Sequence, residues 1–276
     1  MQVRDAPFTK LCSTKNILTV NGQFSGLTLY VTKGETIIVD VYNKANYNIT
    51  IHWHGVNQPR YPWSDGPKYI TQCPIQPGGK FSQKPAAGNT YPFPKPDREV
   101  PIILGEWWKE DVVKVFDDLV TTGRDAAIYD SYLINGQPGD LHPCSSNDTF
   151  KLKLCEAIQS GIHNNITMDV LLHANQQPLD RYYMAAKAYS SALNVVYDNT
   201  TTTAIVEYKR KHNPSSSSRT PPHMPSLPYF NDTNSSINII SQMRSLADEA
   251  HPINVPMNIT TNLFYTVSIN SLPCPN

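Results

Sequence analysis

The spacing of apolar and polar positions along the chain predicts many short strands joined by turns. In the first third, alternating positions bounded by glycine-containing turns are typical of half-buried strands. Residues 66–83 are expected to add a turn and one further strand. This pattern favours the all-β class. The predicted strands of this region cover residues 16–24, 27–32, 36–43 and 47–54.

The second half continues the strand pattern between two stretches of different composition. Val100–Glu106 is an apolar run of the kind found in buried strands. Residues 85–97 are rich in proline, and residues 210–228 are rich in serine and proline, so both are predicted to be connectors. Five further strands are predicted, at residues 131–134, 149–153, 167–173, 181–189 and 202–209.

Two segments switch from the strand period to the helical period. Residues 109–120 form the first predicted helix, and Gly123 suits its end. Residues 237–248 form the second, with Ser236 as its capping residue. On the helical period, Val112, Phe116 and Leu119 lie on one face of the first helix, and Ile240, Met243 and Ala247 lie on one face of the second.

Composition limits the function classes that fit the chain. Its 276 residues suffice for two ordinary domains, and 23 prolines fit many short strands. The net charge is zero, so nothing indicates binding to nucleic acid or to an anionic membrane. Apolar runs stay below the length of a membrane-spanning helix, so no membrane span is predicted.

The run His52-Trp53-His54-Gly55 carries the clearest chemical signal. On a strand, side chains two residues apart share a face, so His52 and His54 point one way and Trp53 the other. Neutral imidazole is a ligand for copper, zinc and iron. His-x-His occurs nowhere else in the chain. The alternative is a pair of partly exposed histidines on an edge strand without a metal.

A series of longer motifs follows the order found in one protein family. In the first third they are Leu18–Phe24, Gly34–Asn43, His52–Gly55, Trp63–Pro67 and Thr71–Gly78. Further along they are Val100–Trp108, Tyr132–Gly139, Asp169–Asn175 and Asn262–Val267. Together they resemble the plant laccases, which are multicopper oxidases.

The resemblance implies cupredoxin-like (plastocyanin-like) Greek-key β-sandwich domains that are incomplete. It divides the chain into a partial first domain, a linker, a partial second domain that lacks core strands, a connector with a short helix, and the start of a third domain. The corresponding residues are 1–84, 85–97, 98–209, 210–260 and 261–276.

The resemblance also implies a chemistry. Laccases oxidise diphenols and lignin-related phenols with four coppers and reduce O₂ to water, so the implied partners are phenolic small molecules and O₂. It assigns His52 to the type 2 copper and His54 to a type 3 copper. Asp65, in Trp-Ser-Asp-Gly, is most simply a turn residue. Its second implied role is a proton relay beside the copper cluster.

Several blocks of the family pattern are missing. The second histidine motif should follow Gly78, but a proline-rich stretch stands there. The third and fourth motifs, including the cysteine of the type 1 copper, belong to the third domain. The stretch between Lys153 and Met168 resembles nothing in the family. The remaining histidines are expected to be surface or structurally satisfied residues, namely His142, His163, His173, His212, His223 and His251.

Three interpretations stay open at this point. In the first, the chain derives from an active laccase whose sequence has lost blocks. In the second, it is a non-catalytic, secreted cupredoxin-like protein with weak copper binding. In the third, it is a relative of ascorbate oxidase, which the plant-laccase motifs disfavour. In each case the chain is expected to have no oxidase activity by itself, because most of the copper ligands of the family pattern are missing.

Secretion and disulfide bonding follow from the same resemblance. It pairs Cys12 with Cys144 and leaves Cys73 without a partner, with Cys155 and Cys274 unassigned. It also implies a monomer in the apoplast, although the first seven residues lack the apolar core of a signal peptide. Asn-x-Ser/Thr sequons support an extracellular glycoprotein. They lie at Asn48, Asn147, Asn165, Asn199, Asn231, Asn234 and Asn258.

Overall fold

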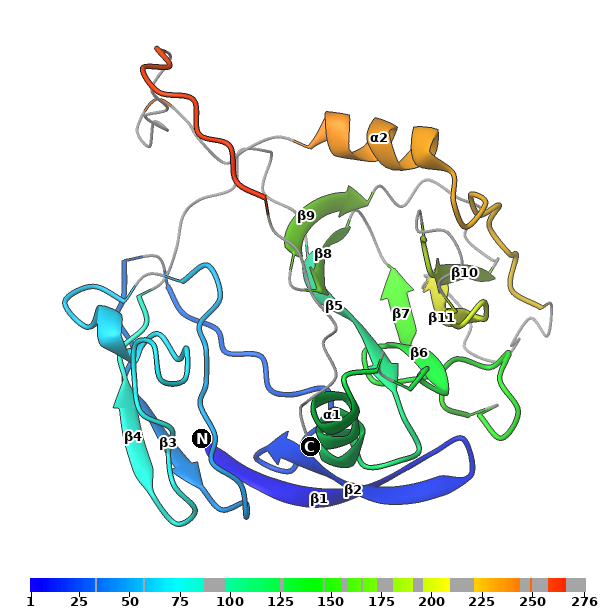
Figure 1. Cartoon of the computed structure of the whole chain (residues 1–276). Coiled ribbons are helices and arrows are strands. Elements are labelled where there is room, and N and C mark those ends of the chain that lie inside the picture. Colours follow the sequence, from blue (N-terminus) through cyan, green and yellow to red (C-terminus); the bar gives the residue numbers. More distant parts are fainter. Residues whose placement is uncertain are drawn as a thin grey trace.

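The computed structural model shows a mostly β protein with three sheets and two helices among its described residues (Figure 1). None of the described helices is long and apolar enough to cross a membrane. The structure describes residues 1–32, 34–56, 58–86, 98–124, 127–145, 147–154, 158–164, 166–172, 181–190, 196–208, 221–243, 249 and 258–266.

The first unit is built on one four-stranded sheet in the order β2-β1-β3-β4. Strands β1 and β2 form an antiparallel hairpin, β3 joins β1 in parallel, and β4 pairs antiparallel with β3. Its core contains Val3, Val39, Val41 and Ile75. The strand bounds are Gln2–Lys10 for β1, Ser13–Val20 for β2, Val39–Asn43 for β3 and Lys80–Gln83 for β4.

In this unit one strand was missed, and two predicted strands are not formed. Strand β1 was not predicted, because Pro7 and two adjacent charged residues interrupt its apolar alternation. Residues 27–32 form no strand, and Leu27, Leu29, Tyr30 and Val31 are exposed. The predicted strand 47–54 is reduced to a single bridge between Ile49 and Ile75. Alternation shows which side chains share a face, but a strand also requires a neighbouring backbone.

The second unit is a β-sandwich of two sheets, ordered β6-β5-β8-β9 and β10-β11-β7. Its core joins Val100, Ile102 and Ile134 of the first sheet to Leu152, Ala204 and Val206 of the second. The first sheet contains β5 (Arg98–Trp107), β6 (Ser131–Ile134), β8 (Ile158–Asn164) and β9 (Ile166–Leu172). The second contains β7 (Lys151–Leu154), β10 (Arg181–Lys187) and β11 (Thr201–Tyr208).

The predicted strands of this unit are confirmed, with ends that shift by at most two residues. Strand β6 covers the predicted residues 131–134. One strand was missed: β8 lies in the stretch between Lys153 and Met168, where no strand was predicted before residue 167. It pairs in parallel with β5 and antiparallel with β9, so it fills the sheet between them.

Helix α1 spans Val112–Thr122 and ends at Gly123, as predicted. Asp111 caps it by accepting a hydrogen bond from the Val113 backbone N–H. Val115 is the buried residue of the helix, whereas the side chains of Val112 and Phe116, from the apolar face named above, are 49% and 62% exposed.

Helix α2 spans Thr233–Gln242, four residues earlier at its start than predicted. The cap is Asp232 rather than Ser236, because the Asp232 carboxylate accepts hydrogen bonds from both the backbone and the hydroxyl of Ser235. On the apolar face named above, Ile240 and Met243 are exposed, and Ala247 lies outside the described residues.

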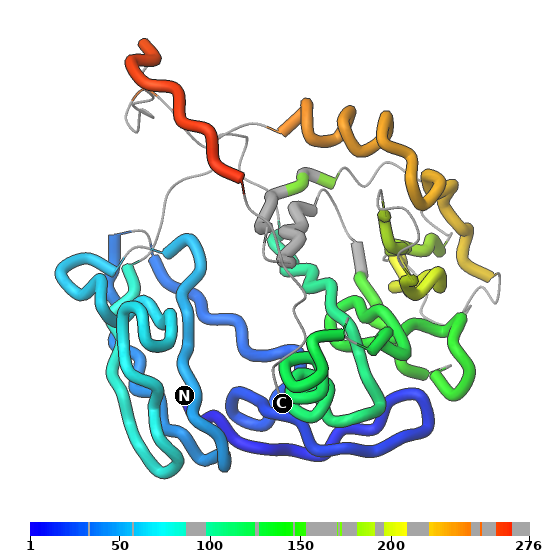
Figure 2. The backbone as a smooth tube through the Cα atoms, in the orientation of Figure 1, coloured from blue at the N-terminus to red at the C-terminus, as the bar shows by residue number. Residues whose placement is uncertain are grey.

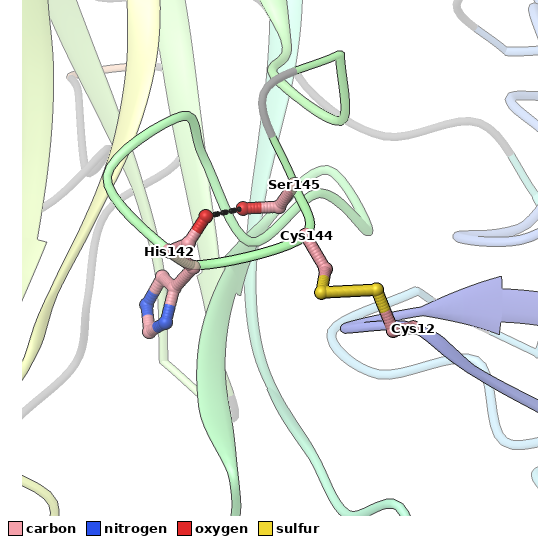
Figure 3. The surroundings of a disulfide bond; sticks show 4 residues. All are labelled: Cys12, His142, Cys144 and Ser145. Atoms are coloured by element: carbon pink, nitrogen blue, oxygen red, sulfur yellow. Dashed lines mark hydrogen bonds between the residues drawn. A yellow bond between two sulfur atoms is a disulfide. The ribbon is translucent and has the colours of Figure 1, made fainter.

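The β1–β2 hairpin reaches across to the second unit, as the path of the chain shows in Figure 2. A disulfide joins Cys12 to Cys144, the pair that the resemblance implies, and Figure 3 shows its surroundings. The buried Lys10 ammonium donates to Gln137 Oε1 at 2.7 Å and lies 3.6 Å from Asp148 Oδ2. The ammonium of Lys15 lies 4.5 Å from the centre of the Trp107 ring. These contacts position the two units relative to each other.

Candidate metal centre

The two histidines lie on the irregular, extended segment that follows the Ile49–Ile75 bridge. The centres of the His52 and His54 rings are 5.5 Å apart, with an angle of 74° between their planes. Trp53 is partly buried and packs against the core of the first unit. The alternation predicted from the sequence is therefore kept, although the segment belongs to no sheet.

Asp65 holds the His52 ring in one orientation. The backbone carbonyl oxygen of Asp65 lies 2.6 Å from His52 Nδ1, and its carboxylate oxygen lies 3.6 Å from the same atom. Because a carbonyl oxygen can only accept a hydrogen bond, Nδ1 carries the proton and Nε2 keeps a free lone pair. Metal-binding histidines have this arrangement, with one nitrogen donating to the protein and the other facing the ion.

The short 3₁₀ turn η1 (Pro62–Ser64) sets the position of Asp65. Asp65 ends this turn, and Gly66 follows with a φ of +109°. A Cβ atom at Gly66 would lie 2.6 Å from the Cα of His52, so only glycine allows the two backbones to approach this closely. The expectation that Asp65 is a turn residue is met by this geometry. Its role as a proton relay stays a prediction.

Gln83, at the end of β4, anchors the segment that carries the histidines. Its side chain is buried, and its Oε1 accepts a hydrogen bond from the Trp53 indole N–H at 2.9 Å. Its Nε2 donates to the carbonyl oxygens of Ile51 at 2.7 Å and Ser64 at 2.8 Å. One side chain thus joins the histidine segment to η1. Sequence reasoning missed this residue, because a single glutamine in a polar strand matches no motif.

We expect Gln83→Leu to lower the free energy of unfolding by about 3 kcal/mol, because it leaves an indole N–H and two backbone carbonyls without partners in a buried place. Urea unfolding followed by tryptophan fluorescence measures this change. Gln76→Leu is the control, since Gln76 is exposed and its side chain has no such contacts among the described residues. Equal stability of the two variants would show that the network contributes little.

The two imidazoles lie close enough together to bind one metal ion or two neighbouring ions. With metal–nitrogen bonds of about 2.0–2.1 Å, two rings on one ion would have centres about 5–6 Å apart, and the centres of the His52 and His54 rings are 5.5 Å apart. Within the described part of the chain, no group of three or more His, Cys, Asp or Glu side chains could hold a metal. Beside Asp65 lies a hollow of about 520 Å³, lined also by Val56, Gln58, Pro59, Pro62 and Ala86.

The other candidate ligands lie elsewhere. His142 contacts the Ser131 hydroxyl in the second unit, and His223 packs against the ring of Tyr182. Cys73 is exposed and has a free thiol. The side chains of His163, His173, His212 and His251, and both Cys155 and Cys274, lie outside what the structure describes. Among the described residues, the ligands needed for a set of four coppers are therefore not found, and His52 and His54 are the two imidazoles that lie close together.

Comparison with known proteins places this geometry in a family. Residues 2–91 match one sequence model of the multicopper oxidases, and residues 98–159 and 161–211 match a second. The chain belongs to the multicopper oxidase family. Among curated relatives, it is 40% identical to laccase-14 of Arabidopsis thaliana and 37% identical to laccase-21 of Oryza sativa subsp. japonica. Each match covers 99% of this chain and 59% of the relative.

Solved structures agree on the fold. The laccase from Botrytis aclada superposes with a TM-score of 0.61 at 21% identity, covering 80% of this chain and 55% of that one. Fet3p, a multicopper oxidase that functions in iron import, gives the same TM-score at 17% identity, covering 84% and 55%. The cupredoxin-like fold predicted for this multicopper oxidase is therefore confirmed.

The multicopper oxidase lacks internal segments that its relatives contain. Its alignment with laccase-14 extends over 344 residues, although the chain has only 276. The relatives therefore carry residues inside the matched region that have no counterpart here. This agrees with the missing second histidine motif. The stretch between Lys153 and Met168 was expected to resemble nothing in the family, but the second family model matches it except at residue 160, so this expectation is wrong.

Six of the seven sequons lie on the surface of the protein. The asparagines at positions 48, 147, 199, 231, 234 and 258 are all exposed, as an attached glycan would require. The seventh, Asn165, lies outside the described residues.

Proposed function

We propose that the chain is a laccase-type multicopper oxidase that binds one copper ion weakly through His52 and His54 and does not oxidise phenols by itself. The observation that supports this proposal most is the ligand count. The sequence contains eight histidines in all, fewer than the laccase pattern uses, and only this pair falls in a family motif. The described residues add no third ligand beside it.

Bound copper would supply one-electron oxidation. The residues of the chain contribute the positioning of the ligands. The Asp65 carbonyl keeps the proton on His52 Nδ1, so Nε2 is available as a ligand. Trp53 and Gln83 fix the backbone between the two imidazoles. Reduction of O₂ to water needs four electrons, and one weakly held ion cannot store them.

The wider proposal follows the family in its remaining features. Phenolic small molecules and O₂ are the implied substrates of an intact laccase, and the apoplast is the implied location. The exposed sequons and the disulfide support an extracellular glycoprotein. We also propose the domain division given above, with a partial first domain to residue 84 and a partial second domain over residues 98–209.

Copper loading tests the proposal. We expect the purified chain to bind at most one copper per chain, to release it to a chelator, and to show no intense blue thiolate band. Oxygen uptake with a diphenol should equal that of the same concentration of free copper. The His52→Ala variant should lose the bound copper. Phenol oxidation well above the free-copper control that disappears in His52→Ala would contradict the proposed lack of turnover.

A further inference from the structure

A hollow of about 510 Å³ lies between the two sheets of the β-sandwich. Strands β5 and β6 line it from one sheet, and β10, β11 and the segment after β10 line it from the other. A volume of this size is typical of pockets that hold small organic ligands. The lining residues that matter for its chemistry are Leu104, Glu106, Tyr132, Ala186, Lys187 and Tyr189.

Strand alternation places a carboxylate on the inner face of this sandwich. On β5, Leu104 packs against the core, so Glu106, two residues further along, points to the same face. On β6, Tyr132 pairs directly with Glu106, just as the core residue Ile134 pairs with Leu104. Glu106 therefore occupies a position that an apolar residue normally fills in a sandwich. The hollow begins where the apolar core ends.

The Glu106 carboxylate lacks a partner among the described residues. Partial desolvation by its surroundings raises the pKa of this carboxyl, and no neighbouring positive charge or hydrogen-bond donor offsets the rise. The Tyr132 hydroxyl donates to the backbone carbonyl oxygen of Asp198 at 3.2 Å, so its contact with the Tyr129 hydroxyl uses the proton of Tyr129. Neither tyrosine has a proton left to donate to the carboxylate.

The lysine beside the hollow points away from the carboxylate. Ala186 packs against the core, so the side chain of Lys187, the next residue on β10, is directed to the outer face, where it is exposed. Tyr189 also lines the hollow, and its hydroxyl donates to the Thr233 hydroxyl at 3.3 Å. The inner faces thus present one negative charge beside apolar and aromatic groups.

We propose that this hollow binds a small organic ammonium ion, with the nitrogen at Glu106 and the hydrocarbon part between the two sheets. An ammonium supplies both the N–H donors and the positive charge that the carboxylate lacks. The rings of Tyr132 and Tyr189 attract a cation through their π faces, and Leu104 and Ala186 offer apolar surface to the rest of the ligand. The site lies in the second unit and does not depend on the copper binding proposed above.

Isothermal titration calorimetry with three matched probes tests this proposal. Phenethylammonium, phenethyl alcohol and hydrocinnamate have similar hydrocarbon parts and differ in charge. The full chain is titrated with a chelator present, so that the amine cannot bind through a metal ion. We expect the ammonium to bind at least about tenfold more tightly than the alcohol, and the carboxylate to bind most weakly. Equal affinities for the ammonium and the alcohol would overturn the ionic contact, and no binding of any probe would overturn the site.

Variants place the bound ammonium at this hollow. Glu106→Gln removes the charge, keeps the size of the side chain, and should lower the affinity for phenethylammonium by at least about tenfold while leaving that for phenethyl alcohol unchanged. Glu99→Gln is the control, because it makes the same change on the outer face of β5. Ala186→Leu fills the hollow and should weaken the binding of every probe. Thermal unfolding checks that each variant is folded. Unchanged affinity for phenethylammonium in Glu106→Gln would overturn the proposal.

Discussion

Replacing both Cys12 and Cys144 by alanine is expected to lower the free energy of unfolding by about 4–5 kcal/mol. The two residues are 132 positions apart, so the bond closes a very long loop in the unfolded chain. In the entropy model the stabilisation grows with loop length, and a loop of this size lies at the upper end of the usual range. Urea unfolding of oxidised wild type and of the double variant measures the difference.

The structure of the variant should change little, which is what makes the experiment informative. The hairpin stays attached to the second unit through Lys10, which contacts Gln137 and Asp148, and through Lys15 on Trp107. Cys73→Ala is the control, because the exposed free thiol should contribute less than about 0.5 kcal/mol. A double variant as stable as wild type would mean that the unfolded chain is already held compact by other contacts.

Asn43→Leu is expected to destabilise the first unit by about 3–5 kcal/mol. Asn43 is fully buried at the end of β3. Its Nδ2 donates to the carbonyl oxygens of Tyr47 at 2.7 Å and Ile75 at 2.8 Å, and its Oδ1 accepts from the Ala45 backbone N–H at 3.0 Å. Leucine has a similar size but satisfies none of these groups, so three buried polar atoms lose their partners.

The same substitution should also affect the metal site. The Ile75 carbonyl that Asn43 holds belongs to the bridge with Ile49, and the histidine segment begins just beyond that bridge. Thermal unfolding measures the stability, and titration with Cu²⁺ measures the affinity. Asn16→Leu makes the same chemical change at an exposed strand position and should alter neither. Loss of stability without any change in Cu²⁺ affinity would show that the histidine segment is positioned independently of Asn43.

The local sequence pattern was sufficient to predict those strands and helix ends whose determining residues lie within a few positions of one another. Strand β6 and the end of α1 at Gly123 follow directly from apolar runs and from the conformational freedom of glycine. The opposite directions of the histidine pair and Trp53 also follow from the two-residue period of an extended chain. The order of motifs along the chain was sufficient for the family and for the pairing of Cys12 with Cys144.

The tertiary structure decided everything that depends on which backbone lies next to which. Residues 47–54 have the alternation of a strand but pair only at Ile49, because a ladder requires a neighbour along its whole length. The orientation of the His52 ring depends on the carbonyl oxygen of Asp65. The position of the backbone just before His52 depends on Gln83 of β4, which donates to the Ile51 carbonyl oxygen. These partners are distant in sequence and carry no periodic signal. The sequence by itself thus determined the histidine pair and its spacing, whereas the fold determined its support and its exposure at the surface.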